Sequence, residues 1–446
     1  MFIMISFLKY HLMNKLSDIS YNELYTQKNI SMSINKKIHY KNKLRIAIYT
    51  YSIKNGGRAR TTAIFLQYLY KVKIFILYLF TSRFKEENEY NIPEGIKRIV
   101  IKNDIIKVIK KNKIDVLIYE LDKIEEISFL NRFNNTKVIF YHHSSTFDWI
   151  YKNYTFFKEI YQSFINSKNF VSIVPFESNY LFKKWGIQSI LMDNYITYEF
   201  NSVIQTDLGS KTIIMLGRAK AKKKRFILGI QSMEYIIKEI PDCELKIISN
   251  ITGVNKHQYF VENINLQNNI KNLGYIASPD ILFKNVSLSF FPSITEALPM
   301  VLFETKIYGI PNILLGLDYI ANSKGGALII YDDTPERLAK ETIYILKNKR
   351  YNKRLSLAAR NSIKKFNNEL LLAKWIKLIL SIYKNDCYYK KFREDDKKIN
   401  EKEAIKIVEN QVKLLKIRVR NFLNISSKNY ENFTWMKQIN PKNIYY

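Results

Sequence analysis

Two glutamates separated by seven residues stand out in the second half of the chain. Glu296 follows an apolar run that predicts a buried strand, and Glu304 lies in the first turns of a helix predicted over 301–308 and ended by Gly309. The free N–H groups at a helix start form an anion site. A diphosphate bound there would leave both carboxylates to accept hydrogen bonds from sugar hydroxyls. An ordinary helix cap beside a solvated acidic face has the same spacing, so spacing alone leaves both interpretations open.

A basic loop precedes this pair in the chain. A predicted strand ends at Gly217, and Arg218 and a lysine cluster follow before the next helix. Arg218 and Lys224 could neutralise the two phosphates of a nucleotide diphosphate and stabilise it as a leaving group. A solvated basic loop is the competing interpretation.

Together, these two features resemble the group 1 glycosyltransferases, that is, glycosyltransferase family 4 with the GT-B fold. The shared pattern is Gly-Arg, then Lys-Arg-Phe, then two glutamates with seven residues between them, then Gly-Ile-Pro. The resemblance is good over 210–350 and looser over 43–205. It implies transfer of a sugar from a nucleotide-sugar donor with retention of anomeric configuration.

The resemblance also implies roles for the charged residues. Glu304 would hold the ribose of the donor nucleotide, and Glu296 would contact the donor sugar. Arg218 and Lys224 would bind the diphosphate. The family usually has its lysine five residues after the arginine, which here is Lys223, whereas the Lys-Arg-Phe match favours Lys224.

The turn between the glutamates would assist through its backbone. The resemblance implies that the amides of Leu298, Pro299 and Met300 contact the diphosphate. The family's glycine after the first glutamate is replaced by Ala297, which would narrow the pocket or alter the choice of donor.

The first half of the chain has weaker matches. Gly56 and Gly57 resemble the family's glycine loop, where backbone would approach the acceptor or a phosphate. His142 and His143 end a predicted strand, and because successive side chains point oppositely, only one can face a ligand. The family often has a sugar-contacting histidine here. His143 is the better match, and a purely structural histidine is the alternative.

The sequence predicts neither a cofactor nor a required metal. Transferases of the other common fold use an Asp-x-Asp triplet to hold a metal under the diphosphate, and no such triplet occurs. Cationic side chains would do that work here.

Strands and helices alternate along most of the chain. Predicted elements are a strand at 44–49, a helix at 61–70 and a strand at 72–80, and the pattern restarts with a strand at 212–216 and a helix at 226–239. Such alternation indicates parallel sheets. The predicted class is α/β, with two doubly wound Rossmann-like domains facing across a cleft, and ligands in such sheets bind at the carboxyl ends of the strands.

These elements predict four segments. An N-terminal arm covers 1–42, an acceptor domain 43–205, a nucleotide-sugar donor domain 206–385, and a basic helical tail 386–446. The tail has apolar residues at helical spacing. One interpretation is a basic amphipathic helix that lies on an anionic membrane or forms a short coiled coil. The other interpretation is a helix packed on its own domain.

Composition supports a folded protein with an unusual charge. The chain has 446 residues, of which 47% are apolar and 25% charged, as in ordinary two-domain proteins. Lys and Arg number 71 against 40 for Asp and Glu, which gives a net charge of +31. Such a surface attracts nucleic acid, anionic lipid or phosphorylated substrates, although AT-rich codon usage could produce the same excess.

Other sequence features point to a cytoplasmic setting. Two cysteines, Cys243 and Cys387, predict no disulfide framework. The longest apolar runs, at 1–8 and 72–82, are too short to span a bilayer, and the first lacks a signal-peptide cleavage site.

The predicted function is therefore a retaining glycosyltransferase with a nucleotide-sugar donor. Its acceptor would be a glycan or lipid-linked hydroxyl in surface polysaccharide or glycolipid synthesis, and the protein would be cytoplasmic or peripheral at the inner face of the membrane. Alternatives are a GT-B epimerase or phosphorylase, a catalytically dead binding module, and a basic nucleic-acid-binding protein. No RNA-binding signature, zinc finger or Arg/Gly repeat occurs, so no specific nucleic-acid partner is expected.

Overall fold

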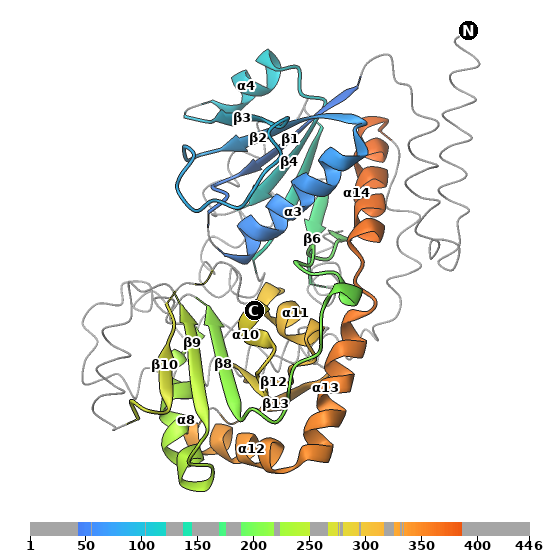
Figure 1. The fold of residues 1–446 in the computed structure, drawn as a ribbon. Coiled ribbons are helices and arrows are strands. Elements are labelled where there is room, and N and C mark those ends of the chain that lie inside the picture. Colours follow the sequence, from blue (N-terminus) through green and yellow to red (C-terminus); the bar gives the residue numbers. More distant parts are fainter. Residues whose placement is uncertain are drawn as a thin grey trace, which may run out of the picture.

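The computed structural model contains two parallel β-sheets, one in each half of the chain (Figure 1). It describes residues 43–54, 56–102, 104–121, 137–144, 169–174, 189–217, 224–249, 266–274, 276, 280–293, 296–315, 325–330, 332 and 334–385. The predicted arm over 1–42 and tail over 386–446 lie outside this set. The predicted α/β class with two parallel sheets is confirmed.

The first sheet has seven strands in the order β3-β2-β1-β4-β5-β6-β7. They are β1 (Leu44–Thr50), β2 (Phe75–Thr81), β3 (Lys97–Val100), β4 (Val116–Leu121), β5 (Val138–His142), β6 (Phe170–Ser172) and β7 (Ser189–Leu191). All neighbours pair in parallel. All six residues of β4 are buried, as expected for a central parallel strand covered on both faces.

Two helices connect the first strands. Helix α3 (Gly57–Val72) follows β1, and α4 (Ile105–Lys111) follows β3. The Asp104 carboxylate caps α4 by accepting hydrogen bonds from two backbone amides. The sequence predicted a strand from residue 72, but it begins at Phe75, because α3 runs to Val72 and ends at Lys73 in the left-handed conformation.

The second sheet has six strands in the order β10-β9-β8-β11-β12-β13. They are β8 (Thr212–Gly217), β9 (Glu244–Ser249), β10 (Ile270–Asn272), β11 (Leu288–Phe291), β12 (Asn312–Leu315) and β13 (Ala327–Ile330). The sheet is also entirely parallel. The carboxyl ends of β8 and β9 point toward the first domain (Figure 1).

Helices flank this sheet. They are α8 (Phe226–Glu239), α10 (Asp280–Phe283), α11 (Met300–Ile307), α12 (Pro335–Lys347) and α13 (Lys349–Ile363). Helix α14 (Asn368–Tyr383) closes the described part of the chain, and a short 3₁₀ helix, η4 (Phe200–Ser202), lies in the connection between the sheets. Helix α8 has the predicted bounds. Helix α11 stops as predicted, with Gly309 at a φ of 74°, a conformation that favours glycine.

Helix α14 packs on the first domain although it follows the second in sequence (Figure 1). Its Trp375 ring lies 4.7 Å from the Phe65 ring of α3 and 4.9 Å from the Tyr141 ring of β5. The expected division, with residues 206–385 in one unit, does not anticipate this packing. The last helix therefore joins the two halves of the molecule.

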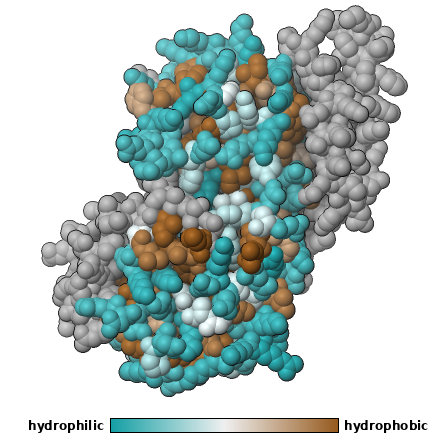
Figure 2. Space-filling model, in the orientation of Figure 1, coloured by the Kyte–Doolittle hydropathy of each residue, from teal (hydrophilic) through white to brown (hydrophobic). Residues whose placement is uncertain are grey.

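Polar and apolar residues are distributed unevenly over the surface. Figure 2 shows hydrophilic residues over most of the visible face, and apolar residues gathered at the end of the second domain nearest the first, beside α10. Among the described residues, no helix is long and apolar enough to cross a membrane.

Helix α11 contains a buried lysine that affects stability. Lys306 is fully buried, and no residue that the structure describes forms a hydrogen bond with its Nζ atom. Burial is the larger cause and the nearby charge of Lys365 the smaller one, and together they lower the pKa of Lys306 to about 7. Between pH 7 and the ordinary lysine pKa, the unfolded chain binds a proton that the folded chain does not, so this residue makes stability rise with pH.

Replacing Lys306 with methionine is expected to stabilise the protein near neutral pH. The gain in unfolding free energy should be on the order of 3 kcal/mol at pH 7 and shrink to about 1 kcal/mol at pH 9.5, since the unfolded lysine then loses its proton too. Urea unfolding of both proteins at the two pH values measures it. Lys340→Met, at an exposed position on α12, is the control, and a gain independent of pH would contradict the explanation.

Candidate functional site

The two predicted glutamates lie on either side of the start of α11. Glu296 is in the loop after β11, and Glu304 is in the second turn of α11. The Glu304 side chain is 1% exposed. Its Oε1 atom accepts hydrogen bonds from the guanidinium of Arg60 and from Thr197 Oγ1, the latter at 2.8 Å. Its Oε2 atom has no hydrogen-bond partner among the described residues.

A second ion pair lies at the carboxyl ends of β8 and β11, which are neighbours in the sheet. Lys224 Nζ donates to Glu296 Oε1. The aliphatic part of Lys224 lies against Gly217, the last residue of β8, where an added Cβ would be 3.6 Å from Lys224 Cε. The structure therefore brings Lys224 and Glu296 together, and their roles toward a donor stay predictions.

The loop before α8 is fixed to the loop after β11. Arg225, at a φ of 47°, donates from Nε to the carbonyl oxygen of Pro292 at 2.9 Å. This contact fixes the chain next to Lys224. Arg218 and Lys223 lie outside the described residues, so the predicted pairing of Arg218 with this site stays a prediction.

The turn into α11 is held from the connection between the domains. Asn194 Nδ2 donates to the carbonyl oxygen of Leu298 at 3.0 Å, and Leu298 and Met300 are buried. Pro299 precedes the helix and makes no side-chain cap. The prediction that all three amides of 298–300 assist an anion needs correction, because proline has no N–H group. Only Leu298 and Met300 could donate.

The glycine loop brings the two domains into contact. Gly56 has a φ of 95° and ψ of 164°, a conformation essentially reserved for glycine. A Cβ on Gly57 would lie 3.0 Å from Met300 Cγ. The starts of α3 and α11 therefore lie against each other across the domain boundary, and the missing side chain of Gly57 permits this approach.

The two histidines have different surroundings at the end of β5. The His142 ring lies 5.9 Å from the Phe170 ring, and burial, with the neighbouring His143, lowers the pKa of His142 to about 3. His143 Nε2 is 3.3 Å from Glu120 Oε1. That carboxylate also accepts a hydrogen bond of 2.5 Å from Thr62 on α3. His143 is thus the histidine on the side of α3.

Glu120 is a buried acid that sequence reasoning missed. It is the fifth residue of β4, and its side chain is inaccessible to solvent. Burial alone would raise the pKa of Glu120, but His143, Arg58 and Thr62 hold it below its usual value. Glu120 therefore stays charged and orients the His143 ring. One glutamate inside an apolar strand run was the signal in the sequence.

Arg60 and Thr197 were also missed. Arg60 is three residues after Gly57, so an arginine just inside the helix that follows a glycine loop could have indicated it. Nothing local distinguishes Thr197, which reaches Glu304 only because the connection between the domains passes α11.

Comparisons with known proteins show which families and folds this chain is similar to. Residues 199–362 match the family model described as "Glycosyl transferases group 1". The poly(glycerol-phosphate) alpha-glucosyltransferase of Bacillus subtilis is 24% identical over 159 residues, which are 35% of this chain and 24% of that protein. The match therefore spans about a quarter of that relative's length.

Solved structures share the fold at low sequence identity. Sucrose-phosphate synthase from Thermosynechococcus elongatus has a TM-score of 0.64 and 14% identity over 77% of this chain and 100% of that chain. Anabaena HepE in complex with UDP and glucose has a TM-score of 0.61 and 12% identity over 76% and 100%. Residues 199–362 therefore match the group 1 glycosyltransferases, and the chain has the GT-B fold.

Proposed function

We propose that this protein is a retaining glycosyltransferase that moves a sugar from a nucleotide-sugar donor to an acceptor hydroxyl. The observation that supports it most is the placement of the two glutamates. Both flank the start of α11, each bonded to a cationic side chain, and one buried oxygen of Glu304 has no partner in the part of the chain that the structure describes. Such an oxygen can accept a hydrogen bond from a ribose hydroxyl.

The remaining donor contacts follow from the same geometry. The diphosphate would lie between the start of α11 and the loop before α8, where Lys224, Arg218 and the amides of Leu298 and Met300 meet it. A diphosphate there would compete with Glu296 for Lys224 and leave that carboxylate for the donor sugar. His143, oriented by Glu120, would contact the sugar from the first domain.

The reaction needs no carboxylate nucleophile. The bond between the anomeric carbon and the diphosphate oxygen breaks, and the acceptor oxygen bonds to that carbon on the same face. The acceptor proton passes to the departing diphosphate. Arg218 and Lys224 stabilise the negative charge that grows on the diphosphate. Such electrostatic stabilisation is usually the largest contribution to lowering the barrier.

We also propose an anionic or membrane-proximal acceptor, in surface polysaccharide or glycolipid synthesis. The net charge of +31 supports it, since a strongly basic surface attracts phosphate-rich polymers and the anionic inner leaflet. The name of the B. subtilis relative refers to such a polymer. The protein would then work in the cytoplasm, peripheral to the inner face of the membrane.

A thermal-shift panel of UDP-, GDP-, ADP- and CMP-sugars tests donor binding. One nucleotide class should stabilise the protein by about 2.7 kcal/mol at a ligand concentration one hundred times its dissociation constant. Glu304→Ala should abolish most of that shift because the ribose contact is lost. Glu341→Ala, in a partly exposed pair with Arg337 on α12, should keep it. A chain that binds none of the four classes would contradict the proposal.

Removing the Lys224 charge should damage catalysis more than binding. Lys224→Ala is expected to lower kcat by about a hundredfold or more, with a smaller change in donor KM, since charge on the leaving oxygen grows toward the transition state. Steady-state transfer to the acceptor measures it, with Lys211→Ala, in an exposed pair with Asp242, as the control. Formation of a C2 epimer without acceptor would instead indicate the epimerase alternative.

We propose that the reaction requires no divalent metal, since cationic side chains meet the diphosphate. Within the described residues, no group of three His, Cys, Asp or Glu side chains is arranged to hold a metal ion. Transfer rates should therefore stay within about twofold after EDTA treatment, because the stabilising charge is covalently part of the chain. A loss that added Mg²⁺ or Mn²⁺ restores would refute this.

A further inference from the structure

We propose that Arg60, on the first domain, is a positioning residue that sets how Glu304, on the second domain, recognises the donor ribose. The inference rests on the proposed function, which assigns the ribose to Glu304. Arg60 itself would not touch the nucleotide. It would act by fixing which carboxylate oxygen faces the ligand.

The hydrogen bonds of Glu304 divide its two oxygens into different roles. Oε1 accepts from both Arg60 and Thr197, and Oε2 from neither. Two donors from different elements on one oxygen oppose rotation of the carboxylate. The second oxygen is therefore held in one direction, and a buried acceptor without a partner is costly unless a donor reaches it.

Arg60 is itself held firmly. Its guanidinium carbon lies 5.3 Å from the centre of the Tyr90 ring, a cation–π distance. Burial opposes the charge, but Glu304 and Tyr90 outweigh it and raise the pKa of Arg60 above its usual value. Arg60 is therefore charged at every physiological pH, and Tyr90 and Glu304 restrict its conformation.

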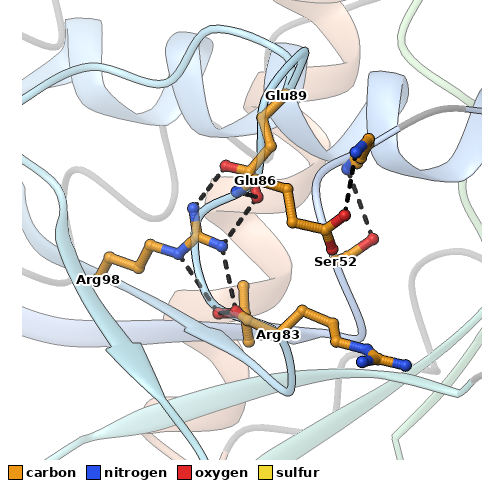
Figure 3. Close-up of polar contacts among 7 residues, drawn as sticks. Ser52, Arg83, Glu86, Glu89 and Arg98 are labelled. Atoms are coloured by element: carbon orange, nitrogen blue, oxygen red, sulfur yellow. Dashed lines mark hydrogen bonds and ion pairs between the residues drawn. The ribbon is translucent and has the colours of Figure 1, made fainter.

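The loop that carries Tyr90 is braced by a network of ion pairs (Figure 3). Arg98 donates to both oxygens of Glu89, at 2.5 and 2.9 Å, and to the carbonyl oxygen of Arg83 at 3.2 Å. Lys54 pairs with Glu86 at 3.0 Å. These contacts join the loop after β2 to the loop after β1 and to β3.

The backbone continues this connection toward Arg60. Tyr90 N donates to the carbonyl oxygen of Ile53 at 3.1 Å, which places the Tyr90 ring beside the first turn of α3. Rigid loops at the edge of the first sheet thus determine where Arg60 meets Glu304.

The connection between the domains supplies the third element. The Tyr195 amide donates to Thr61 Oγ1 of α3 at 2.9 Å, and Thr197 follows two residues later. Both domains and the connection therefore meet at one carboxylate. The nucleotide ribose would be bound well only while this contact holds, so donor recognition depends on the relative position of the domains.

The test compares UDP, GDP and ADP with their 2′,3′-dideoxy analogues by titration calorimetry. For the nucleotide that binds, the wild-type protein should prefer the ribose form by about tenfold or more, the value of a hydrogen bond to a charged group. Arg60→Gln should reduce this ratio to below about threefold with little change in dideoxy affinity. Arg60→Lys should restore part of it.

Controls separate positioning from folding. Arg354→Ala removes another arginine that stacks on a tyrosine, on α13 at 5.1 Å, and should leave the ratio unchanged. If Arg60→Gln lacks the wild-type circular dichroism spectrum, Thr197→Val replaces it, since it removes the other donor to Oε1 and keeps the ion pair. It should lower the ratio by a smaller amount.

The outcomes distinguish the two proposals. An unchanged ratio in folded Arg60→Gln overturns the role of Arg60. If that variant does not fold, an unchanged ratio in Thr197→Val overturns the two-donor positioning of Glu304 on which that role rests. If Glu304→Gln in that case abolishes the preference for the ribose form, the proposed ribose contact of Glu304 is retained without a role for Arg60. A wild-type protein without ribose preference overturns the ribose contact itself, and the role of Arg60 with it.

Discussion

A charged carboxylate buried at the domain boundary constrains the rest of this structure. Glu304 has almost no contact with solvent, and burying an unpaired charge is strongly unfavourable. Arg60 and Thr197 compensate it from two other segments of the chain. The starts of α3 and α11 must then lie close together, and the missing side chain of Gly57 permits this, since a Cβ there would lie 3.0 Å from Met300 Cγ.

The second ion pair obeys a different constraint. Lys224 and Glu296 belong to loops that follow neighbouring strands of one sheet, so parallel pairing of β8 and β11 is enough to bring them together. The Arg60–Glu304 pair instead joins residues 244 positions apart in different domains. One pair depends on the sheet, and the other depends on how the two sheets are held relative to each other.

Helix α14 helps to hold them. Its first residues are attached to the connection between the domains, where the Asn368 side chain bonds both backbone groups of Ile196 at 2.9 Å. Its Trp375 is fully buried against α3 and β5. The segment that leaves the second domain therefore stabilises the helix that carries Arg60, and packing of α14 supports the geometry at Glu304.

The sequence alone determined the alternation of strands and helices and the pair of glutamates, because these depend on local periodicity and on chemistry at fixed spacing. The strand that begins at Thr212, the bounds of α8 and the stop at Gly309 were all readable in this way. Only the tertiary structure decided the partners of those glutamates. Arg60, Thr197 and Glu120 become neighbours of site residues through contacts between distant segments, and no local pattern encodes which buried charge compensates which.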